Sequence, residues 1–293
     1  MPRCQIASLP ERAILTVAGA DARDFLQALV SNDIAKATAE RAIYAALLTA
    51  QGKFLFDFLV LQQAERLLLD CEAARAVALA RRLTLYKLRA KVTIEPLSDW
   101  AVHAAWGEDV FAACGLPAET GRAAPWQGGV VAVDPRLAAL GVRLLLPRAV
   151  SPPALAAATP EDYDRHRLAL AVPDGSRDIE VEKAILLESN FEELNGIDFK
   201  KGCYVGQEVT ARSKYRGLVR KRLMRVDLDG PPPAPGTPIM LGESEAGMLH
   251  SGRDGMAIAL LRLEQVEKAA RSGEPLTAAG RPVRPVKPDW ASF

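Results

Sequence analysis

Short apolar runs alternate with polar turns through the first 170 residues of the chain, and the pattern predicts strands and helices in mixed order. Strands are expected at 13–17, 43–48, 54–61, 67–71, 92–94, 101–105, 130–133 and 142–146. Helices are expected at 22–30, 73–89, 110–114 and 161–170. Elements that alternate in this way indicate an α+β layer fold.

Two of the expected helices have apolar residues at helical spacing, which predicts the face that each one buries. The first follows Asp21, a good N-cap residue, and its stripe is Phe25, Leu26, Leu29 and Val30. The second is the long helix at 73–89, whose predicted buried stripe is Val77, Ala80, Leu83 and Leu88.

The pattern changes twice in the second half of the chain. Residues 173–198 lack periodicity, and a loop of this length inside a compact domain is more often functional than idle. The proline-rich segment 231–236 predicts a semi-rigid linker. Beyond it, short strands alternate with glycine-rich turns, which indicates a small β-barrel at 236–293. Residues 1–230 are then expected to form two interleaved α+β subdomains.

Composition and charge narrow the function. The chain has 293 residues and a net charge of +1, so no global field attracts nucleic acid or a membrane, and the balanced surface fits a monomer. No apolar run reaches about 18 residues, and no secretory signal opens the sequence. Four cysteines without a Cys-x-x-Cys pair, and three histidines, argue against a metal site held by the chain itself. Together these features predict a reducing, cytoplasmic location.

One segment concentrates the candidate chemistry. Two glycines, Gly202 and Gly206, bracket Cys203 and permit positive φ near the thiol. A helix is expected to begin at 206–208 and to continue to about residue 214. A thiol close to a helix N-terminus and to cations is expected to be stabilised as the thiolate, and the same cations would attract an anion. The cations are Lys200, Lys201 and Arg212.

This segment resembles the signature of the YgfZ family of folate-binding proteins. The matching string is Lys201-Gly202-Cys203-Tyr204-Val205-Gly206-Gln207-Glu208, and it is preceded by 195–199 and followed by Tyr215-Arg216-Gly217 and Lys221-Arg222 as in family members. The resemblance covers nearly the whole chain and is looser outside 170–225. It implies the fold of the glycine-cleavage T-protein, with ferredoxin-like α/β layers followed by a C-terminal β-barrel.

The resemblance also implies a function. Members bind tetrahydrofolate or a one-carbon derivative and support assembly or repair of iron–sulfur clusters in client enzymes. Their functional residue corresponds to Cys203, whose thiolate could ligate iron, attack a one-carbon unit or accept sulfur. The implied partners are folate and iron–sulfur client or assembly proteins. The implied folate-binding residues are Asp57, Glu188, Asn190, Lys201, Gly202, Tyr204, Gln207, Glu208 and Arg212.

Three of these residues have a specific expected role. Glu188 can accept two N–H bonds from a pterin edge, and Asn190 can complement the rest of that edge. Asp57 stands where the T-protein has an Asp-Asp pair, with Phe56 at the other position, so it is either a folate-facing group or a hydrogen-bonded structural carboxyl.

Two arginines complete the comparison with the family. Arg12 and Arg167 replace tryptophans that contact folate in some relatives. An arginine can stack on a flat ring, but surface positions are its more common use, and surface positions are expected here.

Two other functions compete with an assembly factor, and whether the chain is an enzyme stays open. A folate-dependent aminomethyltransferase or other one-carbon transfer enzyme would share the fold, although the single Asp57 counts against it. The third hypothesis is a binding module that does not bind folate and serves as an interaction scaffold with the same fold.

Overall fold

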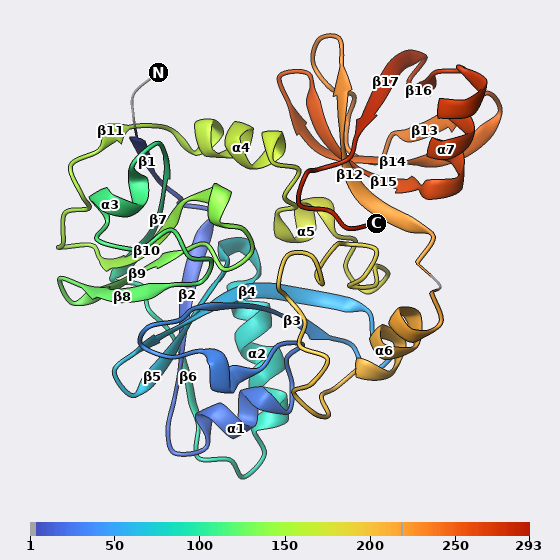
Figure 1. Ribbon diagram of the computed structural model, residues 1–293. Helices are drawn as coiled ribbons and strands as arrows, with labels where there is room; N and C mark the ends of the chain where they lie inside the picture. The colour runs from blue at the N-terminus through green and yellow to red at the C-terminus, as the bar shows by residue number, and fades with distance from the viewer. Residues whose placement is uncertain (1–3, 218) are drawn as a thin grey trace. The chain divides into compact units, whose positions relative to one another are not determined.

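The computed structural model describes residues 4–217 and 219–293, which form two compact units (Figure 1). Among the described residues, unit 1 comprises 4–48, 55–163 and 194–207, and unit 2 comprises 49–54, 164–193, 208–217 and 219–293. The chain therefore passes between the units several times, so neither unit is a continuous segment.

Unit 1 is built on two sheets, and the five strands of one follow each other in sequence between the first and second strands of the other. The six-stranded sheet has the order β11-β1-β7-β10-β9-β8, and the five-stranded sheet has the order β3-β4-β5-β2-β6. The first contains Cys4–Ser8 (β1), Trp100–Gly107 (β7), Ala123–Trp126 (β8), Gly129–Val133 (β9), Val142–Pro147 (β10) and Ala156–Ala157 (β11). The second contains Arg12–Ala18 (β2), Ile43–Leu48 (β3), Phe54–Gln63 (β4), Arg66–Glu72 (β5) and Thr93–Pro96 (β6). All the strands expected in this region are confirmed, and β1, β8 and β11 are additional.

The helices of this region are short. They are Ala22–Gln27 (α1), Ala76–Lys87 (α2), Val110–Ala113 (α3) and Pro160–Ala169 (α4). Helix α1 ends earlier than the apolar stripe suggests. Its N-cap residue Asp21 makes no side-chain cap hydrogen bond, because its carboxylate accepts a hydrogen bond from the Lys91 amide at 2.7 Å instead.

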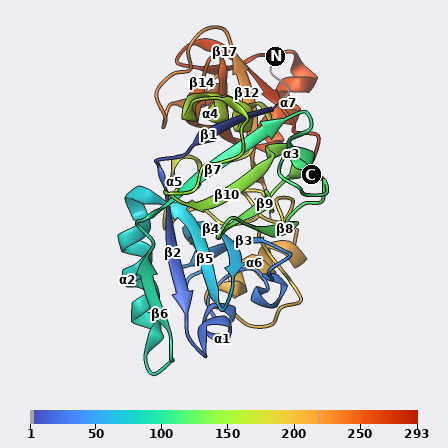
Figure 2. The ribbon, with the colours of Figure 1, turned by 90° about the vertical axis from the view of Figure 1, so that its left-hand side faces the viewer.

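The buried face of α2 differs from the predicted stripe. Helix α2 packs beside β2 and β6 through Ala76, Leu79 and Leu83 (Figure 2). Val77 and Leu88, which the spacing placed inside, are 66% and 90% exposed. The helix is apolar on both faces, so periodicity alone offers two stripes, and only the position of the sheet selects one of them.

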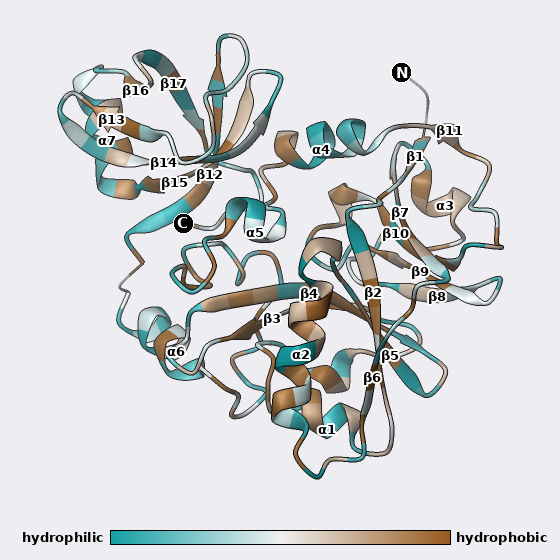
Figure 3. Cartoon of the chain, turned by 180° about the vertical axis from the view of Figure 1, so that it is seen from behind, coloured by the Kyte–Doolittle hydropathy of each residue, from teal (hydrophilic) through white to brown (hydrophobic). Residues whose placement is uncertain are grey.

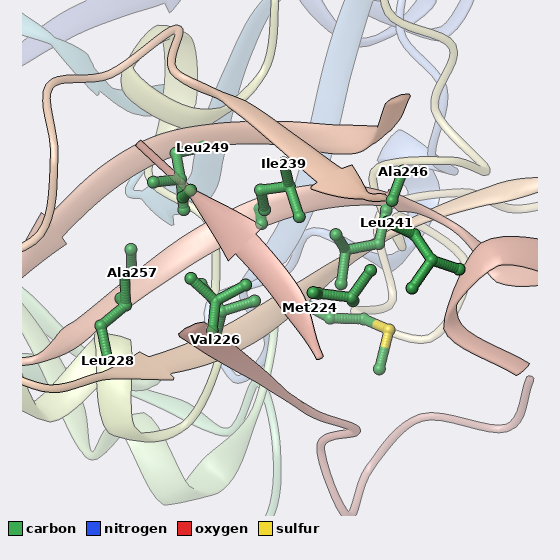
Figure 4. Close-up of a cluster of buried hydrophobic side chains, with 13 residues drawn as sticks. Met224, Val226, Leu228, Ile239, Leu241, Ala246, Leu249 and Ala257 are labelled. Carbon is green, nitrogen blue, oxygen red and sulfur yellow. The ribbon is translucent and has the colours of Figure 1, made fainter. Parts of the chain in front are cut away.

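Unit 2 contains a closed barrel with the strand order β12-β15-β14-β13-β16-β17. Its strands are Lys221–Leu228 (β12), Pro238–Leu241 (β13), Ser244–Arg253 (β14), Met256–Arg262 (β15), Leu276–Ala278 (β16) and Arg281–Val286 (β17). Alternate residues of these strands point inward, and buried residues such as Val226, Ile239 and Leu249 fill the barrel (Figure 4). The predicted C-terminal barrel is confirmed, and Leu263–Ser272 (α7) packs on it through Leu263 and Val266.

The predicted domain boundary at 236 falls inside this barrel. Strand β12 lies upstream of the proline-rich segment 231–236 and pairs with both β15 and β17, so the barrel starts near residue 221. The proline-rich segment connects β12 to β13, and the Gly236 amide donates to the Leu249 carbonyl at 2.8 Å. Prolines suit a connection between strands as well as a linker, and composition does not distinguish the two.

The remainder of unit 2 is largely irregular, as expected for residues 173–198. It contains only Gly175–Asp178 (α5) within that stretch and is followed by Gln207–Tyr215 (α6), the helix expected after the glycine-bracketed cysteine. Among the described residues, no helix is long and apolar enough to cross a membrane.

Candidate functional site

The turn at residues 198–207 in unit 1 presents Cys203 to solvent. Its start is fixed by Asp198, whose amide donates to the Ser31 carbonyl at 3.0 Å and whose carboxylate pairs with Lys36 at 2.5 Å. The same carboxylate accepts a hydrogen bond from the Lys200 amide at 2.6 Å. Through these contacts the chain enters the turn at a defined point before the thiol.

Lys201 attaches the turn to the end of α1. Its ammonium donates to the carbonyls of Gln27 at 2.6 Å and Val30 at 2.5 Å, and the Gln27 side chain returns a hydrogen bond to the Lys201 carbonyl. Gln27 is the last residue of α1 and Val30 lies three residues beyond it, so both carbonyls are at the C-terminal end of the helix, where cations are favourable. Burial lowers the pKa of Lys201 to about 8. The ammonium is therefore used to hold the backbone in place.

A second attachment lies just beyond the thiol. The Val205 amide donates to the Ala28 carbonyl at 3.1 Å, and the Tyr204 amide donates to Gln207 Oε1 at 3.2 Å. The buried Tyr204 ring lies 5.0 Å from the Lys201 ammonium. Both flanks of Cys203 are thus tied to the segment 27–30, and the thiol lies at the exposed point between them.

The two glycines that bracket Cys203 are required for backbone conformation. Gly202 has φ +92° and Gly206 has φ +81°, values that other residues rarely adopt. A Cβ atom added at Gly202 would meet no atom within 4 Å, so crowding is not the reason for glycine there. The positive φ expected from the sequence is confirmed at both positions.

The other cysteines differ from Cys203 in exposure. Cys71 and Cys114 are buried, and burial raises the pKa of their thiols to about 12 and about 11. Cys4 is half-buried, whereas Cys203 is exposed. All four are free thiols. Since the thiolate is the form that binds metals and attacks electrophiles, Cys203 is the cysteine suited to chemistry with a partner.

A metal held by Cys203 would need ligands from elsewhere. Within residues 4–217 and 219–293, no group of three or more His, Cys, Asp or Glu side chains is arranged to hold a metal ion. A single exposed thiol supplies one ligand, and an iron–sulfur cluster needs several.

Asp57 lies in the interior of unit 1 on β4. The Tyr44 hydroxyl donates to its Oδ2 at 2.9 Å, and among the described residues no donor lies within hydrogen-bonding distance of its Oδ1. Burial raises the pKa of Asp57 to about 6, and the charge of Arg12 opposes that shift. An acceptor that is buried and unsatisfied is the kind of group that an N–H donor of a bound ligand would satisfy. Phe56, at the position of the second T-protein carboxylate, lies under the Arg75 guanidinium at 4.3 Å.

Glu188 and Asn190 lie in unit 2 and have different surroundings. Glu188 lines a cavity of about 200 Å³ together with Lys183, Lys221 and Arg262, and burial raises its pKa while Lys221 opposes the rise. A cavity for a whole drug-sized ligand measures about 300–1,000 Å³, so this one suits a smaller group. Asn190 is fully buried with φ +60°, and its amide donates to the Leu223 carbonyl at 2.7 Å. The Asn190 side-chain N–H group is therefore already occupied by a hydrogen bond within the protein.

The remaining predicted contacts are divided between the units. Gln207 belongs to unit 1, whereas Glu208 and Arg212 belong to unit 2, where they form an ion pair on the exposed side of α6. The structure brings Lys201, Gly202, Tyr204 and Gln207 together around Cys203 within unit 1, and Asp57 lies elsewhere in that unit.

The predicted surface positions of Arg12 and Arg167 are wrong. The Arg12 side chain is 10% exposed and pairs with Asp70 at 2.7 Å. The Arg167 side chain is 4% exposed and pairs with Asp164 and Asp178. Burial of an arginine requires acidic partners, and although Asp164 is only three residues from Arg167, the other partners Asp70 and Asp178 are brought close by the fold and leave no local pattern.

Sequence reasoning also missed the groups that position the site. The Gln27, Ala28 and Val30 carbonyls that hold the turn are more than 170 residues from it, and backbone carbonyls leave no sequence signal. Tyr44 was missed as the partner of Asp57. The available clue was that only a few residues separate the expected strands 43–48 and 54–61, which are neighbours in the five-stranded sheet.

The sequence is similar to one protein-family model and to several known proteins. A protein-family model described as the CAF17 C-terminal beta-barrel domain matches residues 220–293. The iron–sulfur cluster assembly factor IBA57, mitochondrial, of Homo sapiens is 34% identical over 312 residues, covering 96% of this chain and 84% of the relative. The protein of the same name from Mus musculus is 34% identical over 319 residues, with the same shares covered. The cytoplasmic location expected from the sequence is contradicted by these relatives, which are named as mitochondrial proteins.

A known protein structure has a fold similar to that of this chain. The glycine cleavage system aminomethyltransferase T from Bartonella henselae matches with a TM-score of 0.78 at 17% identity, covering 99% of this chain and 87% of that one. At this identity the match shows the fold, and it confirms the expected T-protein-like architecture. The family resemblance seen in the sequence pointed to YgfZ, whereas the matched relatives carry the name of a related family of iron–sulfur assembly factors.

Proposed function

We propose that this chain, which belongs to the IBA57 family of iron–sulfur cluster assembly factors, uses Cys203 to ligate iron of a cluster that a second protein also holds. The observation that supports this role is an exposed thiol whose two flanks are both hydrogen-bonded to residues 27–30. The cluster is the cargo, and the partner supplies its other ligands. The attachments hold the thiol in one place without burying it, so a large partner can reach the sulfur.

Tetrahydrofolate is the proposed small ligand. Asp57 fits it, because the buried Oδ1 has no donor among the described residues and a pterin edge carries N–H groups. Bound tetrahydrofolate supplies a carrier for one-carbon units. Asp57 would accept an N–H from it, and Tyr44 would hold the carboxyl in orientation through its 2.9 Å hydrogen bond.

The assembly role is tested in cells that lack the chain and any paralogue. Wild type, Cys203→Ser and the control Cys4→Ser are expressed, and the activity of an aconitase-type client is measured together with its protein level. We expect Cys4→Ser to restore full activity and Cys203→Ser to restore less than about a tenth, because serine is a poor iron ligand. Full restoration by Cys203→Ser would refute the proposed role of the thiol.

The folate role is tested by calorimetry with tetrahydrofolate on purified wild type, Asp57→Asn and Cys203→Ser. We expect Asp57→Asn to weaken binding about tenfold or more, since a charged acceptor is lost. We expect Cys203→Ser to bind as wild type does. Absence of heat and of a thermal shift at millimolar ligand would exclude folate and leave the cluster role intact.

The alternative is folate-dependent aminomethyl transfer. One observation favours it: a carboxyl with a pKa of about 6 is suited to exchange protons near neutral pH. The T-protein-like fold is compatible with it, whereas Phe56 at the second carboxylate position is not. Turnover of an aminomethyl donor by wild type, abolished in Asp57→Asn, would establish this activity. Absence of turnover with glycine-cleavage components would exclude it.

A further inference from the structure

The outward face of α2 in unit 1 carries apolar side chains in an exposed position. Val77, Leu85 and Leu88 are 66%, 72% and 90% exposed. Val77 and Leu85, eight residues apart, lie on one side of the helix, opposite the buried Leu79 and Leu83, and Leu88 follows as the C-cap residue with φ +45°. In the hydropathy view, apolar and polar stretches interleave along the ribbon of α2 (Figure 3). Contiguous exposed apolar residues of this kind indicate an interaction site.

The same helix is strongly basic. From residue 73 to residue 94 the chain has six cations and no acidic residue, which leaves 31 basic residues against 36 acidic ones in the rest of the chain. Arg81 falls between Val77 and Leu85, and Arg82 lies at the edge of the apolar stripe by helical spacing, whereas Arg89 lies two residues past the end of the helix. The other cations are Arg75, Lys87 and Lys91.

Most of these charges have no counter-ion among the residues that the structure describes. Arg75 lies 3.8 Å from Glu72 and over the Phe56 ring. No ion pair joins Arg81, Arg82 or Arg89 to a carboxylate within the part of the chain that the structure describes. A guanidinium beside exposed leucines is suited to a carboxylate that arrives from outside, because it can form a bidentate pair as the apolar surface is covered.

We propose that this face, defined by Val77, Arg81, Arg82, Leu85, Leu88 and Arg89, binds an acidic surface of a partner protein with an apolar centre. A membrane is the less suitable occupant, because interfacial helices separate a broad apolar face, often with aromatic residues, from their cations. Here the face offers three aliphatic side chains with an arginine between them. Arginine together with apolar residues is typical of a protein interface.

The charge and the apolar stripe have separable roles in this contact. Arginines at an interface raise the association rate and make it sensitive to salt, whereas the buried leucines slow dissociation. None of the six side chains is among the buried residues of α2, and Leu88 and Arg89 lie just past its end, so substitutions there leave the packing of Ala76, Leu79 and Leu83 unchanged. Loss of binding can therefore be distinguished from loss of folding.

The first experiment identifies the partner. A photo-cross-linking amino acid replaces Thr84, an exposed residue beside the stripe, in the full-length chain expressed in its own host. A second chain carries the same amino acid in place of Lys268 on α7 as the control. We expect a cross-linked protein specific to position 84. If position 84 yields none beyond the control, the proposal is refuted.

The second experiment tests the chemistry with that protein purified. Affinity is measured for wild type, Leu85→Ser/Leu88→Ser, Arg81→Glu/Arg82→Glu and the control pair Lys268→Glu/Arg271→Glu. We expect both α2 variants to bind about tenfold more weakly or worse, with melting temperatures unchanged and the control equal to wild type. We expect affinity to fall between 50 and 500 mM salt, roughly as screening requires.

Three outcomes would overturn the proposal. They are unchanged affinity in the α2 variants, a partner whose bound surface is not acidic, and flotation with phosphatidylserine vesicles that the same variants abolish while no protein is cross-linked. The variant Cys203→Ser is carried through both the cross-linking and the affinity experiments as a control, because it does not change the residues of the α2 face. The outcome for α2 is therefore independent of the outcome for the thiol.

Discussion

Unit 1 contains two regions that use polar side chains in opposite ways. In the buried ion cluster of Arg12, Asp70, Arg143, Asp134 and Arg136, the side chains pair with one another at distances from 2.7 to 3.5 Å. In the turn at 198–207, the polar groups form hydrogen bonds with backbone atoms, and the thiol of Cys203 stays exposed to solvent. In the first region, the pair between Asp70 on β5 and Arg143 on β10 joins the two sheets of the unit. The second region instead exposes the sulfur atom of Cys203.

The difference predicts how each region responds to substitution. A buried charge that loses its partner costs much folding stability, whereas a solvent-exposed side chain costs little. Asp57 lies between these extremes, because it is buried but only partly satisfied. The four predictions below rank substitutions by their expected effect on the free energy of unfolding.

The largest loss is expected for Asp70→Asn. Asp70 is fully buried and is the counter-ion shared by Arg12 and Arg143, so removing its charge should cost about 3–5 kcal/mol. Urea unfolding at pH 7 measures the loss. Glu119→Gln, which breaks the exposed pair with Arg41, is the control and should cost less than about 1 kcal/mol. Similar losses of unfolding free energy in the two variants would contradict the expected difference between buried and exposed charges.

The next effect depends on pH and belongs to Asp57. Because the pKa of Asp57 is about 6 in the folded chain against 3.8 ordinarily, the folded state holds its proton more tightly. Stability from this group is therefore complete below about pH 4 and is lost as the pH rises to 6, by about 3 kcal/mol.

Asp57→Asn should remove this dependence. The variant is expected to gain stability relative to wild type between pH 4 and pH 7, by denaturant unfolding at both values. Tyr44→Phe removes a hydrogen bond that lowers the pKa of Asp57, so it should extend the loss to higher pH. An equal pH slope in wild type and Asp57→Asn would show that Asp57 does not titrate abnormally.

A moderate effect is expected for Lys201→Met. The ammonium satisfies two carbonyls after α1, and its loss should cost about 1–3 kcal/mol and loosen the turn around Cys203. Hydrogen exchange at 201–206 should rise. The neighbouring Lys200→Met is a matched control, because Lys200 is exposed and should change neither quantity. No difference between the two lysines would refute the anchoring role.

The smallest effect on stability is expected for Cys203→Ser, below about 0.5 kcal/mol, because the residue is exposed. This variant should nevertheless lose the most client activity. A melting temperature lowered as far as in Lys201→Met would mean that the thiol is part of the fold, and the contrast between the two regions would fail.

The sequence alone determined the main elements and the key motif. Apolar runs bounded by polar turns placed β3, β5, β9 and β10 within a residue or two, because strands that are buried on both faces appear in the sequence as continuous apolar runs. Two glycines around Cys203 predicted the positive φ, because that conformation is local. The resemblance carried by residues 201–208 led to an iron–sulfur assembly family.

The tertiary structure decided what depends on distant residues. It selected Leu79 over Val77 for the core of α2, moved the start of the barrel to Lys221, and buried Arg12 beside Asp70. Each of these depends on a partner 40 or more residues away, or on which of two apolar faces meets the sheet. Local pattern carries no information on such partners, since burial and pairing are properties of the folded chain.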